Sequence, residues 1–340
     1  MKPIRSIEAL GEQGLTNPAL HDDLQRVVEQ FALRITPHVA GQLSNPAIAR
    51  QYIPSTDELI ITPEELADPI GDEAHTPVKG ITHRYADRVL LKPTHTCAVY
   101  CRFCFRRETV GQAEQALSAA EMHTAIAYIA NHPEIWEVIL SGGDPLVLSD
   151  RRLNDIAQSV SAVDHVQILR LHTRVPVAEP SRITPGLLAA LKSRLATYVV
   201  VHVNHADEIT PDVKRTFALL ADSGIPLLSQ SVLLRGINDT AEALTKLMRT
   251  LVANRVKPYY LHQTDLAKGT GHFRVPIAEG QELMRAMRGP VSGLCQPTYV
   301  LDIPGGHGKV PVGPEYLEGN AVRDINRKLH TLNSVIPSKP

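Results

Sequence analysis

Three cysteines, Cys97, Cys101 and Cys104, lie within eight residues and carry the most specific chemistry of the chain. Their C-x₃-C-x₂-C spacing does not suit a structural zinc site, which takes four ligands, or a thioredoxin-like site, which takes one C-x-x-C pair. Three thiolates on one tight loop suit three irons of a 4Fe–4S cube whose fourth iron stays open. The plainer alternative is three buried thiols, since free cysteine often packs as a small hydrophobe. The spacing favours an open, catalytic cluster.

Two glycine-containing segments are further candidates for chemistry. Glycines in Ser141-Gly142-Gly143-Asp144 would let the backbone approach a ligand closely, although a glycine pair alone is a weak signal. A second loop, Pro304-Gly305-Gly306-His307-Gly308-Lys309, ends on a lysine. Alone it reads as a surface lysine on a flexible turn. A mobile lysine in a protected site is also what a Schiff base with pyridoxal phosphate requires.

The elements that must position these residues begin near residue 86, where short β-branched runs alternate with amphipathic helical stretches. Strands are expected at 89–91, 137–140, 166–171, 198–203, 226–233, 257–262 and 298–302, and helices at about 118–131, 149–161, 185–194, 211–223, 240–254 and 278–288. Buried strands that alternate with helices indicate a parallel sheet. The expected fold class is therefore α/β, a partial or complete parallel β/α barrel.

Polar residues recur after these strands, at the end of the barrel that carries chemistry in such folds. Ordinary loop composition would also place some polar residues there, but their recurrence at one end of successive units favours function. The predicted cofactor contacts from this pattern are Ser141, Gly142, Gly143, Asp144, His202, Asn204 and Gln230.

The chain divides into three expected regions. Residues 1–85 are predicted to be mostly helical, with helical periodicity over 22–33 and a polar, acidic loop or linker over 63–80. Residues 86–315 form the expected barrel, and residues 316–340 a C-terminal tail.

Composition narrows the partners and the compartment. The 340 residues carry a net charge of −1 and no basic block, which argues against nucleic acid. No apolar run approaches the length of a membrane span, and the N-terminus lacks the apolar segment of a signal peptide. Clustered cysteines with a distant Cys295 do not make a disulfide framework. We expect a soluble, cytoplasmic protein.

The cysteine motif resembles the signature of radical S-adenosylmethionine (SAM) enzymes, because an aromatic residue, Phe103, precedes the third cysteine. The resemblance implies that the open iron is chelated by SAM, which the reduced cluster cleaves to a 5′-deoxyadenosyl radical. Within this resemblance, the Gly142-Gly143 loop is similar to the motif that holds the methionyl amino group of SAM.

The chain further resembles the lysine 2,3-aminomutase family, over roughly residues 30–315. The matching stretches are 80–90, 97–107, the Gly-Gly-Asp loop, 230–239, 271–274 and the Lys309 loop. The resemblance implies pyridoxal phosphate as a second cofactor, bound covalently by Lys309. It assigns the cofactor phosphate to Arg84 and Arg88, the substrate carboxylate to Arg106, and the substrate side-chain ammonium to Asp265 and Asp302. Two carboxylates would select a cationic side chain strongly.

The activity implied is conversion of L-lysine to β-lysine by a radical 2,3-amino shift, an isomerase reaction. Shorter family members act on a lysine or lysyl group linked to elongation factor P, which is the nearer alternative. The more distant alternative is a non-catalytic iron–sulfur electron carrier. A one-electron donor such as flavodoxin or ferredoxin is an expected partner, and a homo-oligomer is compatible with the resemblance.

Two departures from the family pattern stand out. His307 replaces a glycine of the lysine loop, which bears on the mobility of that loop. Longer family members carry a C-terminal cysteine-rich extension that binds zinc. No cysteine follows Cys295, so the expectation is that this site is missing and the oligomer interface differs.

Overall fold

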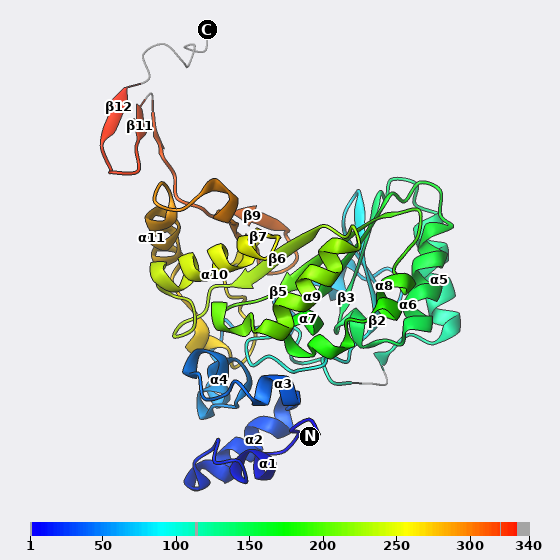
Figure 1. The fold of residues 1–340 in the computed structure, drawn as a ribbon, viewed down its shortest axis with the longest axis horizontal. Helices are drawn as coiled ribbons and strands as arrows, with labels where there is room; N and C mark the ends of the chain where they lie inside the picture. Colours follow the sequence, from blue (N-terminus) through cyan, green and yellow to red (C-terminus); the bar gives the residue numbers. More distant parts are fainter. Residues whose placement is uncertain (1, 113–114, 320, 332–340) are drawn as a thin grey trace.

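The computed structural model describes residues 2–112, 115–319 and 321–331, and its centre is one curled sheet of nine strands in sequence order (Figure 1). β1 (Ile81–Tyr85) forms an antiparallel hairpin with β2 (Arg88–Thr94). Parallel neighbours follow from β2 to β8, and β9 (Lys309–Pro311) returns antiparallel to β8. The intervening strands are β3 (Glu137–Gly142), β4 (Ile168–Thr173), β5 (Ala196–His202), β6 (Leu227–Val232), β7 (Val256–His262) and β8 (Thr298–Asp302).

The sheet is an open half-barrel, because β1 and β9 are its two ends in the strand order of the described residues. This confirms the partial form of the predicted barrel. Each predicted strand overlaps one of β2–β8, and the reason is clearest in β5, where Val199, Val200 and Val201 are fully buried. The edge strands β1 and β9 were not predicted.

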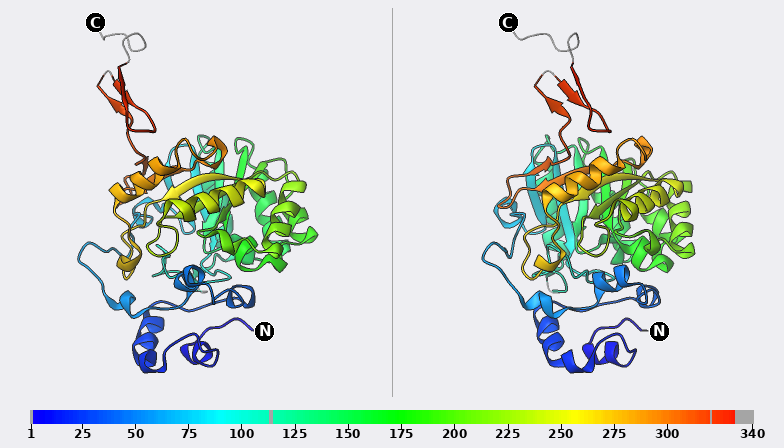
Figure 2. Two further views of the ribbon diagram at one scale, coloured as in Figure 1. Left: turned by 60° about the vertical axis from the view of Figure 1, so that its left-hand side comes forward. Right: turned by 90° about the vertical axis from the view of Figure 1, so that its left-hand side faces the viewer.

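Helices cover the convex side of the sheet, as the two rotated views show (Figure 2). The long ones are α5 (Ala119–Ala130), α6 (Asp150–Ser161), α9 (Pro211–Asp222), α10 (Ala241–Ala253) and α11 (Ile277–Met287), with shorter α7 (Val175–Ala178) and α8 (Pro185–Ala190). Ser and Thr side chains cap the starts of several helices; Ser118 and Glu121, for example, form a capping box on α5. Six of these seven helices, all except α7, agree with the prediction.

The N-terminal region contains several short helices and lies below the sheet in Figure 1. It contains α1 (Ile7–Gly11), α2 (His21–Gln30), α3 (Pro37–Ala40) and α4 (Pro46–Tyr52). Its apolar side chains form a core that also includes Val99 from the cysteine loop and Ala178 from α7. The N-terminal helices therefore support the loop that carries the cysteines.

Beyond β9 the chain forms a small antiparallel sheet that projects from the body (Figure 1). Its strands are β10 (Leu317–Glu318), β11 (Ala321–Arg323) and β12 (Leu329–Thr331), which the expectation of a plain tail did not include. Residues 332–340 of that predicted tail lie outside the described residues.

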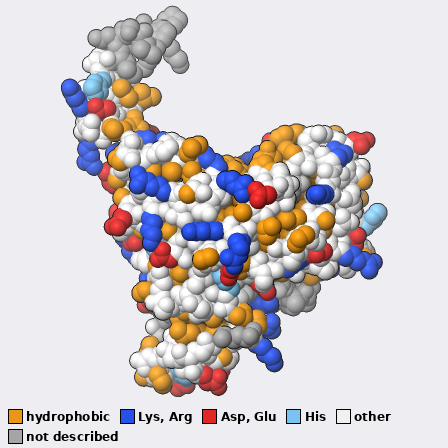
Figure 3. All heavy atoms as spheres, viewed as in Figure 1, with side chains coloured by type: hydrophobic (Ala, Val, Ile, Leu, Met, Phe, Trp, Pro, Cys, Tyr) orange, Lys and Arg blue, Asp and Glu red, His pale blue; other side chains and the backbone are white. Residues whose placement is uncertain are grey.

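Charged side chains of both signs are interspersed over the face drawn in Figure 3, in keeping with the net charge of −1. Among the helices of the described residues, none is long and apolar enough to span a membrane.

Candidate active site

A cavity of about 780 Å³ takes lining residues from all nine strands of the large sheet and from the cysteine loop. The sequence-predicted site residues that line it are Arg84, Arg88, Cys97, Cys101, Cys104, Arg106, Ser141, Gly142, Gly143, Asp144, His202, Gln230, Asp265, Asp302 and Lys309. Asn204 is the one predicted site residue that does not line it. The fold thus gathers at one place residues that are widely separated along the chain.

The three cysteine thiols contribute to the wall of this cavity. Burial raises the pKa of each thiol, to about 11 for Cys104. The other two thiols raise the pKa of Cys97 further, so the three side chains are within electrostatic reach of one another. Among the described residues, no three Cys, His, Asp or Glu side chains converge as ligands of a single metal ion. A 4Fe–4S cube binds each thiolate at a different iron, and three neighbouring thiols facing one cavity fit that donor set.

The glycine loop packs directly on the backbone before Cys97. The Gly143 N–H donates to the Thr94 carbonyl at 2.7 Å, and the Asp144 N–H donates to the Thr96 carbonyl at 2.9 Å. A Cβ atom at Gly143 would lie 2.4 Å from the Thr96 oxygen, so any larger residue would push the two loops apart. Both loops face the cavity, and this close approach fits a ligand held jointly by the cysteine loop and exposed backbone.

Asp144 acts as a buried acceptor that ties the glycine loop to the end of β4. Its carboxylate accepts from the Thr173 hydroxyl at 2.7 Å and from the Arg174 and Val175 N–H groups at 2.6 and 3.1 Å. Burial raises the pKa of Asp144, although these hydrogen bonds oppose the shift. The carboxylate is thus occupied within the protein while the residue lines the cavity.

Arg174 connects the cysteine loop to a shell of buried polar side chains, namely Gln51, Asn204 and Glu208. It was not among the predicted site residues. It donates from Nη1 to the Cys101 sulfur at 3.0 Å and from Nη2 to Glu208 and Gln51, each at 2.6 Å. Asn204 belongs to this shell: its amide donates to Gln51 at 3.1 Å and accepts from the Val232 N–H at 2.9 Å. Its partners are therefore structural, whereas the prediction placed it against a cofactor.

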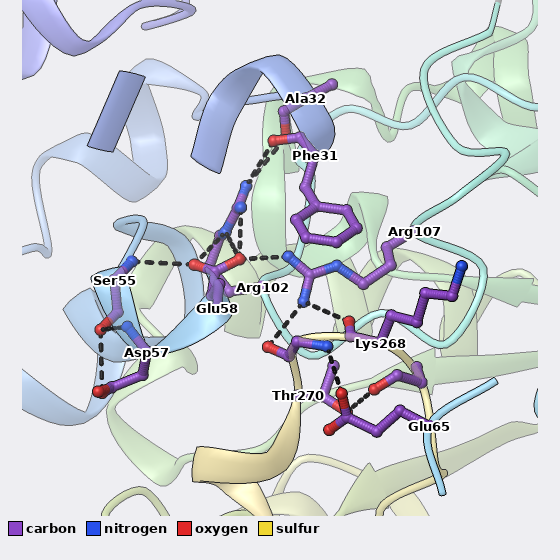
Figure 4. A network of polar contacts seen from close by, with 12 residues as sticks. Phe31, Ala32, Ser55, Asp57, Glu58, Glu65, Arg102, Arg107, Lys268 and Thr270 are labelled. Atoms are coloured by element: carbon purple, nitrogen blue, oxygen red, sulfur yellow. Dashed lines mark hydrogen bonds and ion pairs between the residues drawn. The ribbon is translucent and has the colours of Figure 1, made fainter. Parts of the chain in front are cut away.

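A buried ion-pair network behind the cysteine loop centres on Glu58 (Figure 4). Arg102 donates to both oxygens of Glu58, one of them at 3.0 Å, and also to the Ala32 carbonyl at 3.0 Å. Arg107 pairs with the same carboxylate and donates to the Gly269 carbonyl at 3.1 Å. Arg102 and Arg107 thus pair with Glu58 outside the cavity lining, whereas Arg106 lines the cavity.

Lys309 lies directly opposite Asp302 in the β8–β9 ladder, and their side chains form an ion pair. His262 Nδ1 lies 3.3 Å from the Lys309 ammonium and 3.4 Å from the Asp302 carboxylate. Burial alone would raise the pKa of Asp302, but the His262 hydrogen bond and the Lys309 charge outweigh it and hold that pKa well below its usual range. His262, at the end of β7, was absent from the predicted site.

Asp265 occupies a different electrostatic setting. Burial, with a smaller contribution from the neighbouring Asp302 charge, raises the pKa of Asp265 to about 7. Two carboxylates in one cavity therefore differ strongly in proton affinity, because one has a lysine partner and the other is mainly desolvated. Such a pair would accept a further cationic group.

Two predicted phosphate ligands, Arg84 and Arg88, point in different directions. Arg84 donates to the Ile70 carbonyl and lies 3.4 Å from Asp72 and 3.9 Å from Asp302. Arg88 sits 3.9 Å above the ring of Tyr85 and pairs with Asp87 at 2.6 Å. Both line the cavity that Lys309 also lines, and a phosphorylated cofactor would require such cationic groups.

His307 does not disturb the backbone of the Lys309 loop. Gly305, Gly306 and Gly308 have φ of 83°, 85° and 93°, where glycine is needed, whereas His307 is not among the residues with positive φ. The side chain of His307 is exposed, so the histidine neither strains the backbone nor enters the cavity.

Three histidines at strand ends, His172, His202 and His262, each present a buried Nε2 atom that has no hydrogen-bond partner within the described residues. All three line the cavity, and burial lowers their pKa, well below the ordinary value for His172 and His202. Unpaired buried polar atoms are costly in an empty site and are satisfied when a polar ligand binds. The cavity is therefore lined for polar ligands, and the residues present in it, Lys309 among them, fit pyridoxal phosphate.

An open half-barrel of parallel strands, with three thiols on the loop after its first parallel strand, defines an enzyme of the radical SAM type. A family model described as "Radical SAM superfamily" matches residues 91–248, and one described as "Lysine-2,3-aminomutase" matches residues 284–336.

Several curated proteins are similar to most of the chain. An L-lysine 2,3-aminomutase from Acetoanaerobium sticklandii is 41% identical over 92% of this chain and 77% of its own length. An L-lysine 2,3-aminomutase from Escherichia coli is 39% identical over 83% of each chain. A glutamate 2,3-aminomutase from Clostridioides difficile is 39% identical over 86% of this chain and 70% of its own length.

The chain belongs to the lysine 2,3-aminomutase family of radical SAM enzymes. It is accordingly an isomerase whose cofactors include a 4Fe–4S cluster and SAM, which confirms the enzymatic interpretation over the electron carrier.

Proposed function

We propose that this enzyme converts L-lysine to β-lysine with pyridoxal phosphate as its second cofactor. The observation that carries the proposal is the placement of Asp265 and Asp302 in the same cavity as Lys309, Arg106 and the three cysteines. Bound cofactors supply the hydrogen-abstracting radical and the carbonyl carbon that holds the migrating nitrogen. The protein's task is to bind, orient and enclose the substrate.

The two carboxylates favour lysine over glutamate, the amino acid named for one of the relatives. In this structure Asp302 is neutralised by the Lys309 ammonium. A Lys309 side chain that held pyridoxal phosphate would no longer neutralise Asp302, and a substrate ammonium could then pair with that carboxylate. A glutamate side chain would instead bring a like charge beside Asp302 in a buried site, which is strongly unfavourable.

Other predicted residues also have roles in this proposal. Arg106 receives the α-carboxylate of the substrate, Arg84 and Arg88 receive the cofactor phosphate, and Cys97, Cys101 and Cys104 hold the cluster. Gln230 and His202 offer polar contacts from β6 and β5 to whatever occupies the cavity. A one-electron donor such as flavodoxin or ferredoxin would reduce the cluster.

The test is anaerobic reconstitution with iron, sulfide and pyridoxal phosphate, followed by SAM, dithionite and either L-lysine or L-glutamate. We expect β-lysine from lysine and no β-glutamate. An absorption band of bound pyridoxal phosphate should be present in the wild type and lost in Lys309→Ala. Turnover of glutamate but not of lysine would overturn the substrate assignment.

A parallel arm of the same assay addresses lysine carried by elongation factor P. The same carboxylates would accept a lysyl group, so the arm supplies lysine-modified elongation factor P in place of free lysine. Turnover of the modified protein without turnover of free lysine would replace the proposed substrate while leaving the chemistry intact.

A further inference from the structure

Asp72 brings a carboxylate of the protein to the arginine proposed to receive the substrate carboxylate. The residue precedes the short helix η3 (Glu73–His75), is 7% exposed and lines the cavity. Two nitrogens of Arg106 converge on one oxygen of Asp72, Nε at 2.8 Å and Nη2 at 2.7 Å. Asp72 therefore occupies the guanidinium edge that an α-carboxylate would need.

Asp72 has two further cationic partners besides Arg106. The Lys92 ammonium lies 3.7 Å from the same carboxylate oxygen, and Arg84 lies 3.4 Å from the other oxygen. Lys92 is buried, and its pKa is lowered by that burial while the Asp72 charge opposes the shift. Three cationic side chains thus share one carboxylate, so they could also balance the charge of a second carboxylate.

The backbone around Asp72 is held in place, so an exchange of partners requires only side-chain movement. The Asp68 carboxylate accepts from the N–H groups of Asp72 and Glu73 at 2.9 and 2.8 Å. Gly71 packs against the loop that leads to Lys309, since a Cβ there would lie 2.5 Å from the Gly306 nitrogen.

We propose that Asp72 is a specificity-determining residue that holds Arg106 in the substrate-free enzyme and yields it to the α-carboxylate of the arriving amino acid. Asp72 then keeps Lys92 and Arg84 as partners, so no buried charge is left unpaired during the exchange. The contact that must be displaced lowers the affinity for the substrate carboxylate. This inference rests on the proposed function, because it takes Arg106 as the carboxylate receptor.

The experiment compares Asp72→Asn with the wild type and with Asp212→Asn, a control at an exposed carboxylate on α9. Dissociation constants for L-lysine and for L-lysinamide, which lacks the carboxylate, are measured on protein loaded with cluster, SAM and pyridoxal phosphate. We expect Asp72→Asn to bind lysine about tenfold more tightly, the size of one lost charged hydrogen bond, and to leave lysinamide binding unchanged. The control should match the wild type for both ligands.

Other outcomes separate the two levels of the proposal. Weaker or unchanged lysine binding by Asp72→Asn would overturn the proposal that Asp72 competes with the substrate carboxylate for Arg106. It would indicate instead that Asp72 orients Arg106. Failure of every variant, wild type included, to bind lysine would overturn the proposed function instead.

A measurement on the wild type covers the case in which Asp72→Asn does not fold. A crystal structure of the loaded enzyme with lysine should show the lysine carboxylate on Arg106 and Asp72 on Lys92. An Asp72–Arg106 contact that persists beside the bound carboxylate would overturn the inference.

Discussion

Two parts of the molecule, the cysteine loop and the antiparallel pair of β8 and β9 that carries Lys309 (the Lys309 hairpin), differ in how their charged side chains are paired. Behind the cysteine loop, Glu58 is fully buried and pairs with Arg102 and Arg107, which also donate to backbone carbonyls, although the buried Arg107 Nε has no hydrogen-bond partner among the described residues. At the hairpin, Lys309 and Asp302 pair inside the cavity itself, beside a histidine nitrogen that has no partner among the described residues. The Glu58 ion pairs lie outside the cavity and need no ligand, whereas the Lys309–Asp302 pair is exposed to whatever ligand the cavity binds.

This difference follows from what each part must do. A cluster needs three thiolates held at fixed positions, and buried ion pairs behind the loop provide that support. Under the proposed function, substrate and pyridoxal phosphate bind on the Lys309 side, so their receptors would pair with one another only until a ligand replaces the partner. Mutations in the two sets should therefore affect different properties.

The largest effect is expected from Glu58→Gln, which leaves two buried guanidinium groups facing a neutral amide. Removal of one partner from a buried ion pair costs about 3–5 kcal/mol of unfolding free energy. Urea unfolding of the apoprotein measures the loss, and iron and sulfide content after reconstitution should fall with it. Glu282→Gln is the matched control, since its exposed pairs with Arg285 and Arg327 are worth under about 1 kcal/mol. Equal stability of the two variants would refute the structural role of the Glu58 network.

Asp302→Asn should show the opposite pattern and leave the cysteine loop intact. Loss of one partner of a buried charge pair costs about 3–4 kcal/mol in binding, so kcat/KM for lysine should fall by about 10²–10³-fold. Iron content and SAM binding should match the wild type. A cluster defect of similar size would mean that the two parts of the wall are not independent.

The comparison also explains which features were visible in the sequence. Seven parallel strands were predicted because buried strands read as continuous apolar runs, as in Val199-Val200-Val201. The edge strand that carries Lys309 has no such run: Lys309 is half-buried, and Val310 and Pro311 are exposed. Its pairing with β8 depends on the register opposite Asp302, which local composition does not encode.

The site residues divide in the same way. Those predicted lie in short motifs, such as the cysteine spacing and the glycine-rich lysine loop. Those missed are partners over long sequence separations: Asp72 is 34 positions from Arg106, and Gln51 is 123 positions from Arg174. Nothing near Asp72 or Gln51 in the sequence marks them, because only the folded chain brings their partners close.

The smallest expected effect concerns the pH dependence of lysine binding. It tests whether the Asp265 carboxyl group stays protonated until a substrate ammonium binds. With a pKa raised to about 7, Asp265 in the folded protein keeps a proton that an unfolded chain would release near pH 4. Binding of a substrate ammonium favours the ionised carboxylate and so expels that proton below pH 7. Between pH 6 and pH 7 the lysine affinity of the loaded enzyme should therefore rise by a little under about tenfold, beyond any rise seen in Asp265→Asn.

Unfolding measurements on the apoprotein provide the complementary test of the same carboxyl group. Because the folded-state pKa lies above the unfolded value, the folded state binds more protons between about pH 4 and pH 7, and stability should decline as pH rises through that window. Asp265→Asn should lose this part of the slope, whereas Asp302→Asn should retain it in reduced form, because the neighbouring charge contributes less to the raised pKa than burial does. A wild-type slope identical to that of Asp265→Asn would mean that Asp265 is already ionised and paired before lysine arrives. The contrast between ion pairs that need no ligand behind the cysteine loop and ligand-dependent charges around Lys309 would then fail at Asp265.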